Sequence, residues 1–176
     1  MPLLAAIAYS LDMTKKIWLT KLGGSEFKVM RLQDAPTDNR ILDNPEMIVQ
    51  YLNAQLPNSI AYRPDTENFI VVHLSVRRKP IGFEVISNGT LDTLLVHARE
   101  VFKSAIVANS AAIVLAHNHP SGDPSPSEAD IKVTRDLIRA GQLLKIEVLD
   151  HVILGRATPE QPKAYSSLRE LGYFYT

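Results

Sequence analysis

The sequence contains no cysteine among its 176 residues. Disulfide bonds, cysteine-ligated zinc and a cysteine nucleophile are therefore excluded, and any bound metal must rely on His, Asp and Glu side chains. An excess of one charge is also missing, because 19 Lys and Arg balance 19 Asp and Glu. This balance argues against strong non-specific binding to nucleic acid, although a local basic patch stays compatible with it.

Long hydrophobic runs are missing as well. The apolar stretches are much shorter than the roughly 20 residues that cross a bilayer as a helix. The N-terminus from Met1 to Ala8 is apolar, but it is short and lacks the basic start of a signal peptide. We therefore expect a cytoplasmic protein that does not enter the membrane.

The patterns that are present alternate between strands and helices. A chain of 176 residues with 45% hydrophobic side chains fits one domain with its own core. Apolar, β-branched runs predict strands at 69–76, 81–86, 112–116, 145–149 and 152–154. Helical patterns begin near Asn44, Arg99 and Ser125. This mixture predicts an α/β fold with a mixed central β-sheet flanked by helices.

The start of the third predicted helix has a sequence signature. Ser125 and Glu128 have the spacing of a capping box, and Pro126 takes the first helical position. This interpretation predicts that Asp130 lies in the first or second turn of the helix.

Two histidines at the end of a short apolar strand suggest a metal site. Residues two apart on a strand point the same way, so His117 and His119 can turn both imidazoles toward one ion. The Pro-, Gly- and Ser-rich residues 120–126 then turn the chain toward the helix that carries Asp130. Two imidazoles and a carboxylate are ligands of a zinc site whose fourth position stays open for water.

Simpler interpretations compete with a metal site. Two histidines at this spacing are, by themselves, more often packed or surface side chains. The turn that follows, the helix cap and the helical Asp130 together favour the ligand interpretation. The literal run His-Asn-His at 117–119 is not the HNH nuclease motif, whose residues are dispersed in sequence.

The same residues match a family signature. His-x-His, seven residues, Ser, two residues and Asp is the JAMM pattern, which His117, His119, Ser127 and Asp130 satisfy. The chain more closely resembles the RadC branch of the bacterial JAMM/MPN proteins over roughly residues 43 to 172. The residues that carry the resemblance are Gly89-Thr90-Leu91, His97 to Phe102, His117 to Asp130, Asp150 to Gly155 and Ser167 to Glu170.

The resemblance implies a fold and a chemistry. The fold would be of the MPN type, similar in layout to cytidine deaminases, and would span residues 41–176 after an N-terminal extension, 1–40. JAMM enzymes hold zinc with the two histidines and the aspartate of the motif, and the motif serine, here Ser127, stabilises the tetrahedral intermediate. Their general base is a glutamate at the start of an early strand, which maps best onto Glu67. Glu84 and Glu100 remain rivals for that role.

The chain departs from the RadC pattern in two places. Full-length RadC proteins carry an N-terminal helix-hairpin-helix region, and residues 1–40 are too few and show no convincing hairpin. We therefore expect that module to be absent. Ala98 stands where the family usually has proline, which affects only the entry into a helix.

The leading hypothesis is therefore a zinc-dependent metallopeptidase or isopeptidase that acts on an unidentified protein or peptide. Two alternatives remain. One is a DNA-associated protein of repair or mobile elements without peptidase activity, and the other is a catalytically silent MPN scaffold that binds a partner. The pair Asp150-His151 either orients a metal ligand or forms a turn between two strands.

Overall fold

The computed structural model of the chain describes residues 39–89, 96–159 and 161–175. Residues 1–38 lie outside the described residues, and so does the strand that the alternating sequence of residues 26–32 predicts. The elements are α1 (Pro45–Gln55), a short 3-10 helix (Leu56–Asn58), β1 (Asn68–Leu74), β2 (Pro80–Asn88), α2 (Ala98–Val107), β3 (Ala112–Asn118), α3 (Glu128–Leu144), β4 (Glu147–Leu154) and β5 (Tyr165–Ser167).

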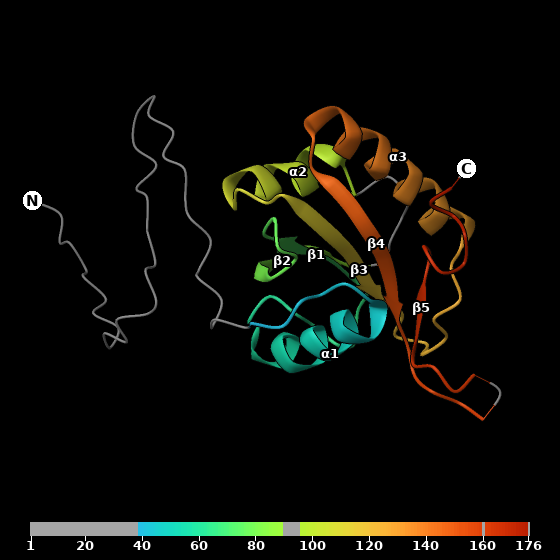
Figure 1. The fold of residues 1–176 in the computed structure, drawn as a ribbon. Helices are drawn as coiled ribbons and strands as arrows, with labels where there is room; N and C mark the ends of the chain where they lie inside the picture. Colours follow the sequence, from blue (N-terminus) through green and yellow to red (C-terminus); the bar gives the residue numbers. More distant parts are fainter. Residues whose placement is uncertain (1–38, 90–95, 160, 176) are drawn as a thin grey trace, which may run out of the picture.

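The described strands form one mixed sheet in the order β2-β1-β3-β4-β5. Only the central pair, β3 and β4, is parallel, and α3 forms the crossover between these two strands. Helix α1 covers one face of the sheet, and α2 and α3 cover the other (Figure 1). The predicted fold class, a mixed sheet flanked by helices, is confirmed.

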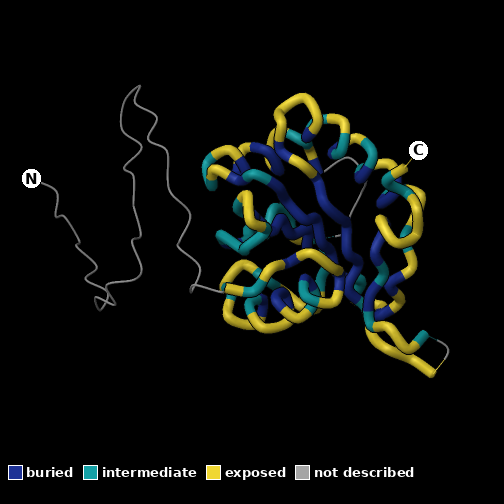
Figure 2. The backbone as a smooth tube through the Cα atoms, in the orientation of Figure 1, coloured by how far each residue is buried: buried dark blue, intermediate teal, exposed yellow. Residues whose placement is uncertain are grey.

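The strands β1 and β3 lie in the middle of the sheet and are buried along their whole length (Figure 2). Burial on both faces explains why both strands appear in the sequence as continuous apolar runs. His73, in the middle of β1, is fully buried, and its Nδ1 lies 3.0 Å from the hydroxyl of Ser110. His73 is a core histidine. It lies near the opposite end of β1 from Phe69, which pairs with His117.

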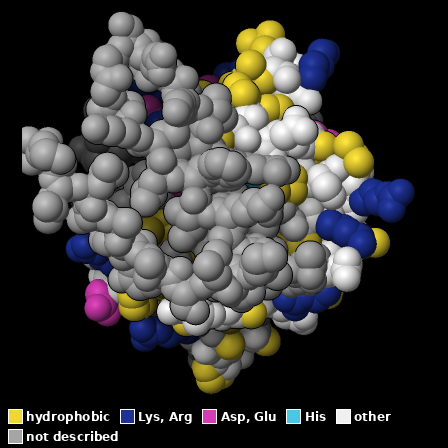
Figure 3. Space-filling view, turned by 90° about the vertical axis from the view of Figure 1, so that its left-hand side faces the viewer, with side chains coloured by type: hydrophobic (Ala, Val, Ile, Leu, Met, Phe, Trp, Pro, Cys, Tyr) yellow, Lys and Arg dark blue, Asp and Glu magenta, His cyan; other side chains and the backbone are white. Residues whose placement is uncertain are grey.

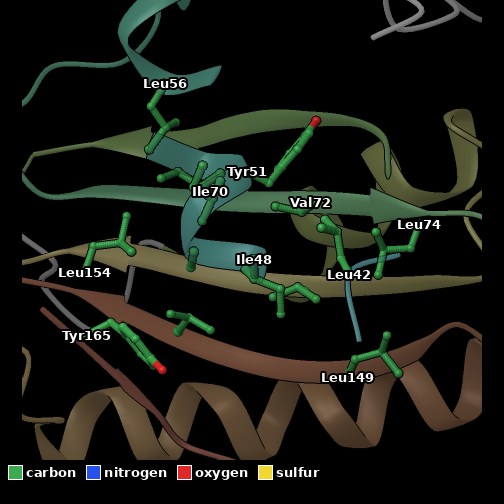
Figure 4. Close-up of a cluster of buried hydrophobic side chains, with 14 of the residues drawn as sticks. Leu42, Ile48, Tyr51, Leu56, Ile70, Val72, Leu74, Leu149, Leu154 and Tyr165 are labelled. Carbon is green, nitrogen blue, oxygen red and sulfur yellow. The ribbon is translucent and has the colours of Figure 1, made fainter. Parts of the chain in front are cut away.

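Hydrophobic side chains pack on both faces of the sheet. On the α1 face, Tyr51 and Ile48 of the helix pack against Ile70, Val72 and other strand residues (Figure 4). Helix α1 begins as its sequence predicts, because the side chain of Asn44 accepts a hydrogen bond from the backbone N–H of Met47.

The other core lies between the sheet and the pair of helices α2 and α3. It contains Phe69, Leu115, Phe102 and Leu137. His117 lies directly opposite Phe69 in the pairing of β3 with β1. Because side chains opposite each other in a ladder share a face, His117 points toward α2 and α3.

Helix α3 begins later than its sequence predicts. Its N-cap is Ser127 rather than Ser125, and Asp130 rather than Glu128 closes the capping box. Two overlapping patterns of the same type compete here, one starting at Ser125 and one at Ser127. The second is used because it buries the side chain of Asp130, whereas Glu128 stays exposed.

The residues 147–154 form one strand, β4, and the interpretation of two strands around a turn at Asp150-His151 is wrong. Polar side chains inside a buried strand need partners, and both residues have them. The Asp150 carboxylate accepts a hydrogen bond of 2.6 Å from the hydroxyl of Ser167, in β5. The His151 ring contacts His117 at 2.8 Å.

In the part of the chain that the structure describes, no helix combines enough length and hydrophobicity to cross a bilayer. On the face shown in Figure 3, the described Lys and Arg side chains are scattered around the rim.

Candidate metal centre

The candidate ligands come from two elements that meet at one end of the sheet. His117 lies near the carboxyl end of β3, His119 follows the strand directly, and Asp130 lies in the first turn of α3. The backbone N–H of His119 donates to the carbonyl of Leu154, at the end of β4, with a distance of 3.0 Å. The carboxyl ends of parallel strands and the start of the crossover helix are a common place for binding sites in α/β folds.

The three side chains converge. One nitrogen of each histidine and one carboxylate oxygen of Asp130 all lie within 4.8 Å of one another. The Nε2 of His117 lies 3.0 Å from the Nε2 of His119 and 3.3 Å from Oδ1 of Asp130. Sequence reasoning predicted these three residues, and the fold brings them together.

The surroundings of His117 favour its neutral form. Burial lowers the pKa of His117 to about 4, and His119 adds to this effect while the carboxylate of Asp130 opposes it. The ring of Phe69 stacks on the ring of His117, with 9° between the two planes. A neutral imidazole is the form that binds a metal.

The second histidine is oriented by a backbone group. The Nδ1 of His119 lies 2.6 Å from the carbonyl oxygen of Asp123. A carbonyl only accepts, so Nδ1 carries a hydrogen, and Nε2 is the ring nitrogen that faces His117 and Asp130. The donor set, two imidazoles and a buried carboxylate, suits a divalent transition-metal ion such as zinc.

Ser127 contacts the carboxylate of Asp130 directly. The hydroxyl of Ser127 donates to Oδ2 of Asp130 at 2.6 Å, and the backbone N–H of Ser127 donates to the same oxygen at 2.8 Å. The Oδ1 atom of Asp130 faces His117. Ser127 therefore holds the orientation of a candidate ligand, a function that its position in the sequence motif did not reveal.

Glu67 lies beside this cluster. Together with His119, Ser127 and Asp130 it lines a pocket of about 310 Å³, and the apolar residues Val96 and Val133 also lie on the pocket wall. The backbone carbonyl of Glu67 accepts a hydrogen bond from the N–H of Gly89, at the end of β2. Apart from Asp130, Glu67 is the only described carboxylate on the wall of this pocket.

The rival glutamates lie elsewhere. Glu84 is opposite Val71 in the pairing of β1 with β2, one strand farther from the histidines than Glu67. Glu100 lies on α2, where its carboxylate faces Lys103 at 3.4 Å and its side chain is 46% exposed. Neither of them lines the pocket, so of these three glutamates only Glu67 lies beside the candidate ligands.

Asn118, between the two histidines, connects them to the segment that carries Glu67. Its Oδ1 accepts hydrogen bonds from the backbone N–H of Asn68 at 3.0 Å and from the side-chain amide of Asn68 at 2.8 Å. Its Nδ2 donates to the carbonyl of Thr66 at 2.9 Å. Sequence reasoning missed this clamp. The one available signal was a polar residue at the end of an apolar strand. Because Asn118 lies between the two histidines in sequence, its side chain points to the opposite face of the strand.

His151 also belongs to the site. Burial, the largest cause, and the neighbouring His117 and His119 lower the pKa of His151 well below its ordinary value. The Nε2 of His151 contacts Nδ1 of His117, and its Nδ1 lies 2.6 Å from the hydroxyl of Thr134. Of the pair Asp150-His151, it is His151 that contacts a candidate ligand and can orient it. Asp150 contacts Ser167 instead. Thr134 lies on the buried face of α3.

The chain is similar to proteins of one known family. Residues 42–173 match the RadC-like JAB domain family. The UPF0758 protein tlr1707 of Thermosynechococcus vestitus is 40% identical over 152 residues, which are 86% of this chain and 56% of the relative. The UPF0758 protein STH371 of Symbiobacterium thermophilum is 41% identical over 143 residues, 81% of this chain and 56% of the relative.

A third relative, the UPF0758 protein TTE0897 of Caldanaerobacter subterraneus, is 51% identical over 108 residues, 61% of this chain and 44% of the relative. The chain thus spans about half the length of the curated relatives it matches. The expected MPN-type fold and RadC resemblance hold, and the chain belongs to the RadC-like JAB domain family.

Proposed function

We propose that this chain is a zinc-dependent metallohydrolase that cleaves an amide bond in a protein or peptide, either in the main chain or at a lysine side chain. The observation that carries the proposal is the convergence of His117, His119 and Asp130, within 4.8 Å of one another, at a pocket with Glu67 on its wall. A ligand triad, an open pocket and a second carboxylate are the parts that metal-assisted hydrolysis needs.

The ligands have separate tasks. His117, His119 and Asp130 would hold the metal, which supplies a Lewis acid that activates water and polarises the carbonyl. The buried His117 and Asp130 fix the inner side of the site, because His117 is fully buried and Asp130 is 4% exposed. His119 is less buried and lies on the pocket wall.

Glu67 would move the proton. A carboxylate on the pocket wall accepts a proton from the attacking water and returns it to the leaving amine, which a general acid–base catalyst must do in an amide hydrolysis. The clamp that Asn118 forms with Asn68 and Thr66 supports this role, since it fixes the Glu67 segment relative to the ligands.

Ser127 would help to stabilise the oxyanion of the tetrahedral intermediate. Its hydroxyl lies on the pocket wall, where a donor could face a substrate carbonyl. In the structure that proton is used for Asp130, so the role in the intermediate requires the hydroxyl to turn. Its contribution to holding Asp130 does not depend on that turn.

The exchange Glu67→Gln tests the proposal, since the amide fills the same space and cannot take up the proton. The zinc-loaded protein is incubated with a peptide library and with lysine-branched isopeptides, and new termini are counted by mass spectrometry. We expect cleavage to fall by about 10²- to 10⁴-fold with zinc retained. Glu84→Gln and Glu100→Gln are the matched controls and should cleave like the wild type.

The alternative outcomes are distinct. Unchanged cleavage by Glu67→Gln would remove Glu67 from the mechanism. Wild-type protein that holds zinc but cleaves neither substrate class would count against an amide hydrolase and would favour a scaffold that binds a partner. A cytoplasmic location and a protein or peptide substrate belong to the same proposal.

A further inference from the structure

The turn that follows His119 lies directly against the end of β4. The backbone N–H of His119 donates to the carbonyl of Leu154 at 3.0 Å, and the backbone N–H of Arg156 donates to the carbonyl of Gly122 at 2.7 Å. Leu154 and Arg156 are the two neighbours of Gly155 in the chain. The turn is therefore fixed to β4 on both sides of this glycine.

Gly155 stands where the two segments approach most closely. A Cβ atom at position 155 would lie 2.5 Å from the carbonyl oxygen of Gly122, and 2.8 Å and 2.9 Å from Cδ and the backbone nitrogen of Pro124. Real Cβ atoms essentially never show contacts this short, and backbone atoms cannot turn away as a flexible side chain can. The φ angle of Gly155 is not in the left-handed region, so glycine is needed here for space and not for its conformational freedom.

The obstructed atoms belong to the peptide bond that orients a candidate ligand. The nitrogen of Pro124 is bonded to the carbonyl carbon of Asp123, and the oxygen of the same carbonyl lies 2.6 Å from Nδ1 of His119. A side chain at position 155 would therefore displace the Asp123–Pro124 peptide and move this oxygen away from its place beside the imidazole.

His119 depends on this contact, because less of the fold holds its ring than holds the ring of His117. The His117 ring is fully buried, stacks on Phe69 and contacts His151. The side chain of His119 is 16% exposed and lies on the pocket wall. Outside the candidate ligands, its ring has one hydrogen-bond partner among the described residues, the carbonyl of Asp123.

We propose that Gly155 is a positioning residue for His119. The missing side chain lets the Asp123–Pro124 peptide lie against the end of β4, where its carbonyl holds the imidazole toward the other candidate ligands. The consequence for zinc binding rests on the proposed function, whereas the contact of the turn with β4 is a property of the metal-free chain. Gly155 itself does not line the pocket, so it acts through the turn and not on a substrate.

The exchange Gly155→Ala tests the proposal, and Gly141→Ala is its matched control. A Cβ atom at position 141 would lie equally close, 2.5 Å, to a backbone carbonyl oxygen, that of Ile146, but near the opposite end of α3 from Asp130. Both variants should be less stable than the wild type, and only Gly155→Ala should change the metal site.

Two readouts of the metal site separate positioning from a loss of stability. Zinc affinity is measured in competition with a chromophoric chelator, and the absorption spectrum of the cobalt(II)-loaded protein reports the geometry of the ligands. We expect Gly155→Ala to bind zinc about 10- to 100-fold more weakly than the wild type and to show a changed cobalt spectrum. Gly141→Ala should match the wild type in both measurements.

Hydrogen exchange of the metal-free proteins gives a readout that needs no metal. The backbone N–H groups of His119 and Arg156 are protected while the turn lies against β4. We expect both groups to exchange faster in Gly155→Ala than in the wild type, relative to the N–H groups of β3. Gly141→Ala should leave this ratio unchanged.

Wild-type zinc affinity with an unchanged cobalt spectrum in Gly155→Ala would overturn the proposal, and so would unchanged exchange of the two N–H groups. If Gly155→Ala does not fold, exchange in the wild type decides: protection of both groups supports the proposal, and rapid exchange of both contradicts it. Wild-type protein that protects both groups but binds no zinc would contradict the proposed function while the contact of the turn with β4 holds, so the two failures are distinguishable.

Discussion

The Oδ2 atom of Asp130 accepts hydrogen bonds from both the hydroxyl and the backbone N–H of Ser127, while Oδ1 of the same carboxylate faces His117. One oxygen therefore closes the cap of α3, and the other belongs to the candidate metal site. This division links the stability of the helix start to the position of a ligand.

The exchange Ser127→Ala should affect stability and metal binding together. Loss of an N-cap side chain costs about 1 kcal/mol of unfolding free energy, measured by urea denaturation. Because Asp130 also loses a donor, zinc affinity should fall in the same variant. Ser125→Ala is the matched control, since Ser125 precedes the helix and does not cap it. A larger stability loss in Ser125→Ala would contradict the observed cap.

Removal of the Asn118 side chain should separate catalysis from metal binding. Asn118→Ala deletes the bonds to Asn68 and Thr66 and removes the side-chain acceptor of the buried Asn68 backbone N–H, which costs about 1–3 kcal/mol of stability. His117 keeps its place in β3, and His119 keeps its place directly after the strand. We expect zinc content to persist while cleavage falls, because a misplaced catalytic group costs up to about 10²-fold. Loss of zinc together with activity would show that the clamp supports the ligands instead.

Acid should destabilise the metal-free protein partly through His73. Burial lowers the pKa of His73 from 6.5 to about 4, and among the described residues its Nε2 has no hydrogen-bond partner. The unfolded chain therefore binds a proton that the folded chain refuses, so this part of the stability is present above pH 6.5 and is lost as the pH falls toward about 4.

The variant His73→Gln isolates this contribution, because its amide does not titrate and can still reach Ser110. Between about pH 7 and about pH 4.5, the wild type should lose about 2–3 kcal/mol more unfolding free energy than the variant. Urea denaturation of both metal-free proteins measures the difference. Equal losses of unfolding free energy in the two proteins would show that folding does not lower the pKa of His73.

The sequence predicts the parts of this molecule that depend on nearby residues. The strand before His117, the helix start at Asn44 and the ligand spacing up to Asp130 are all local patterns. The start of α3 and the continuity of β4 are not local. Two capping patterns overlap at Ser125 and Ser127, and tertiary packing of the Asp130 side chain selects between them.

The orienting residues were not predictable for the same reason. Asn118 acts on residues that are 50 and 52 positions away, Asn68 and Thr66. Thr134 reaches His151 across 17 positions, and His151 reaches His117 across 34. Their chemistry depends on partners that only the folded chain brings together.

The metal content of the purified protein tests the central claim most directly. Elemental analysis compares the wild type with His117→Ala, and with His97→Ala as a control, since His97 is an exposed histidine at the start of α2. The account predicts about one zinc per chain in the wild type and in His97→Ala, and its loss in His117→Ala. Wild-type protein that holds no metal even after zinc is added back, or zinc that persists in His117→Ala, would contradict it.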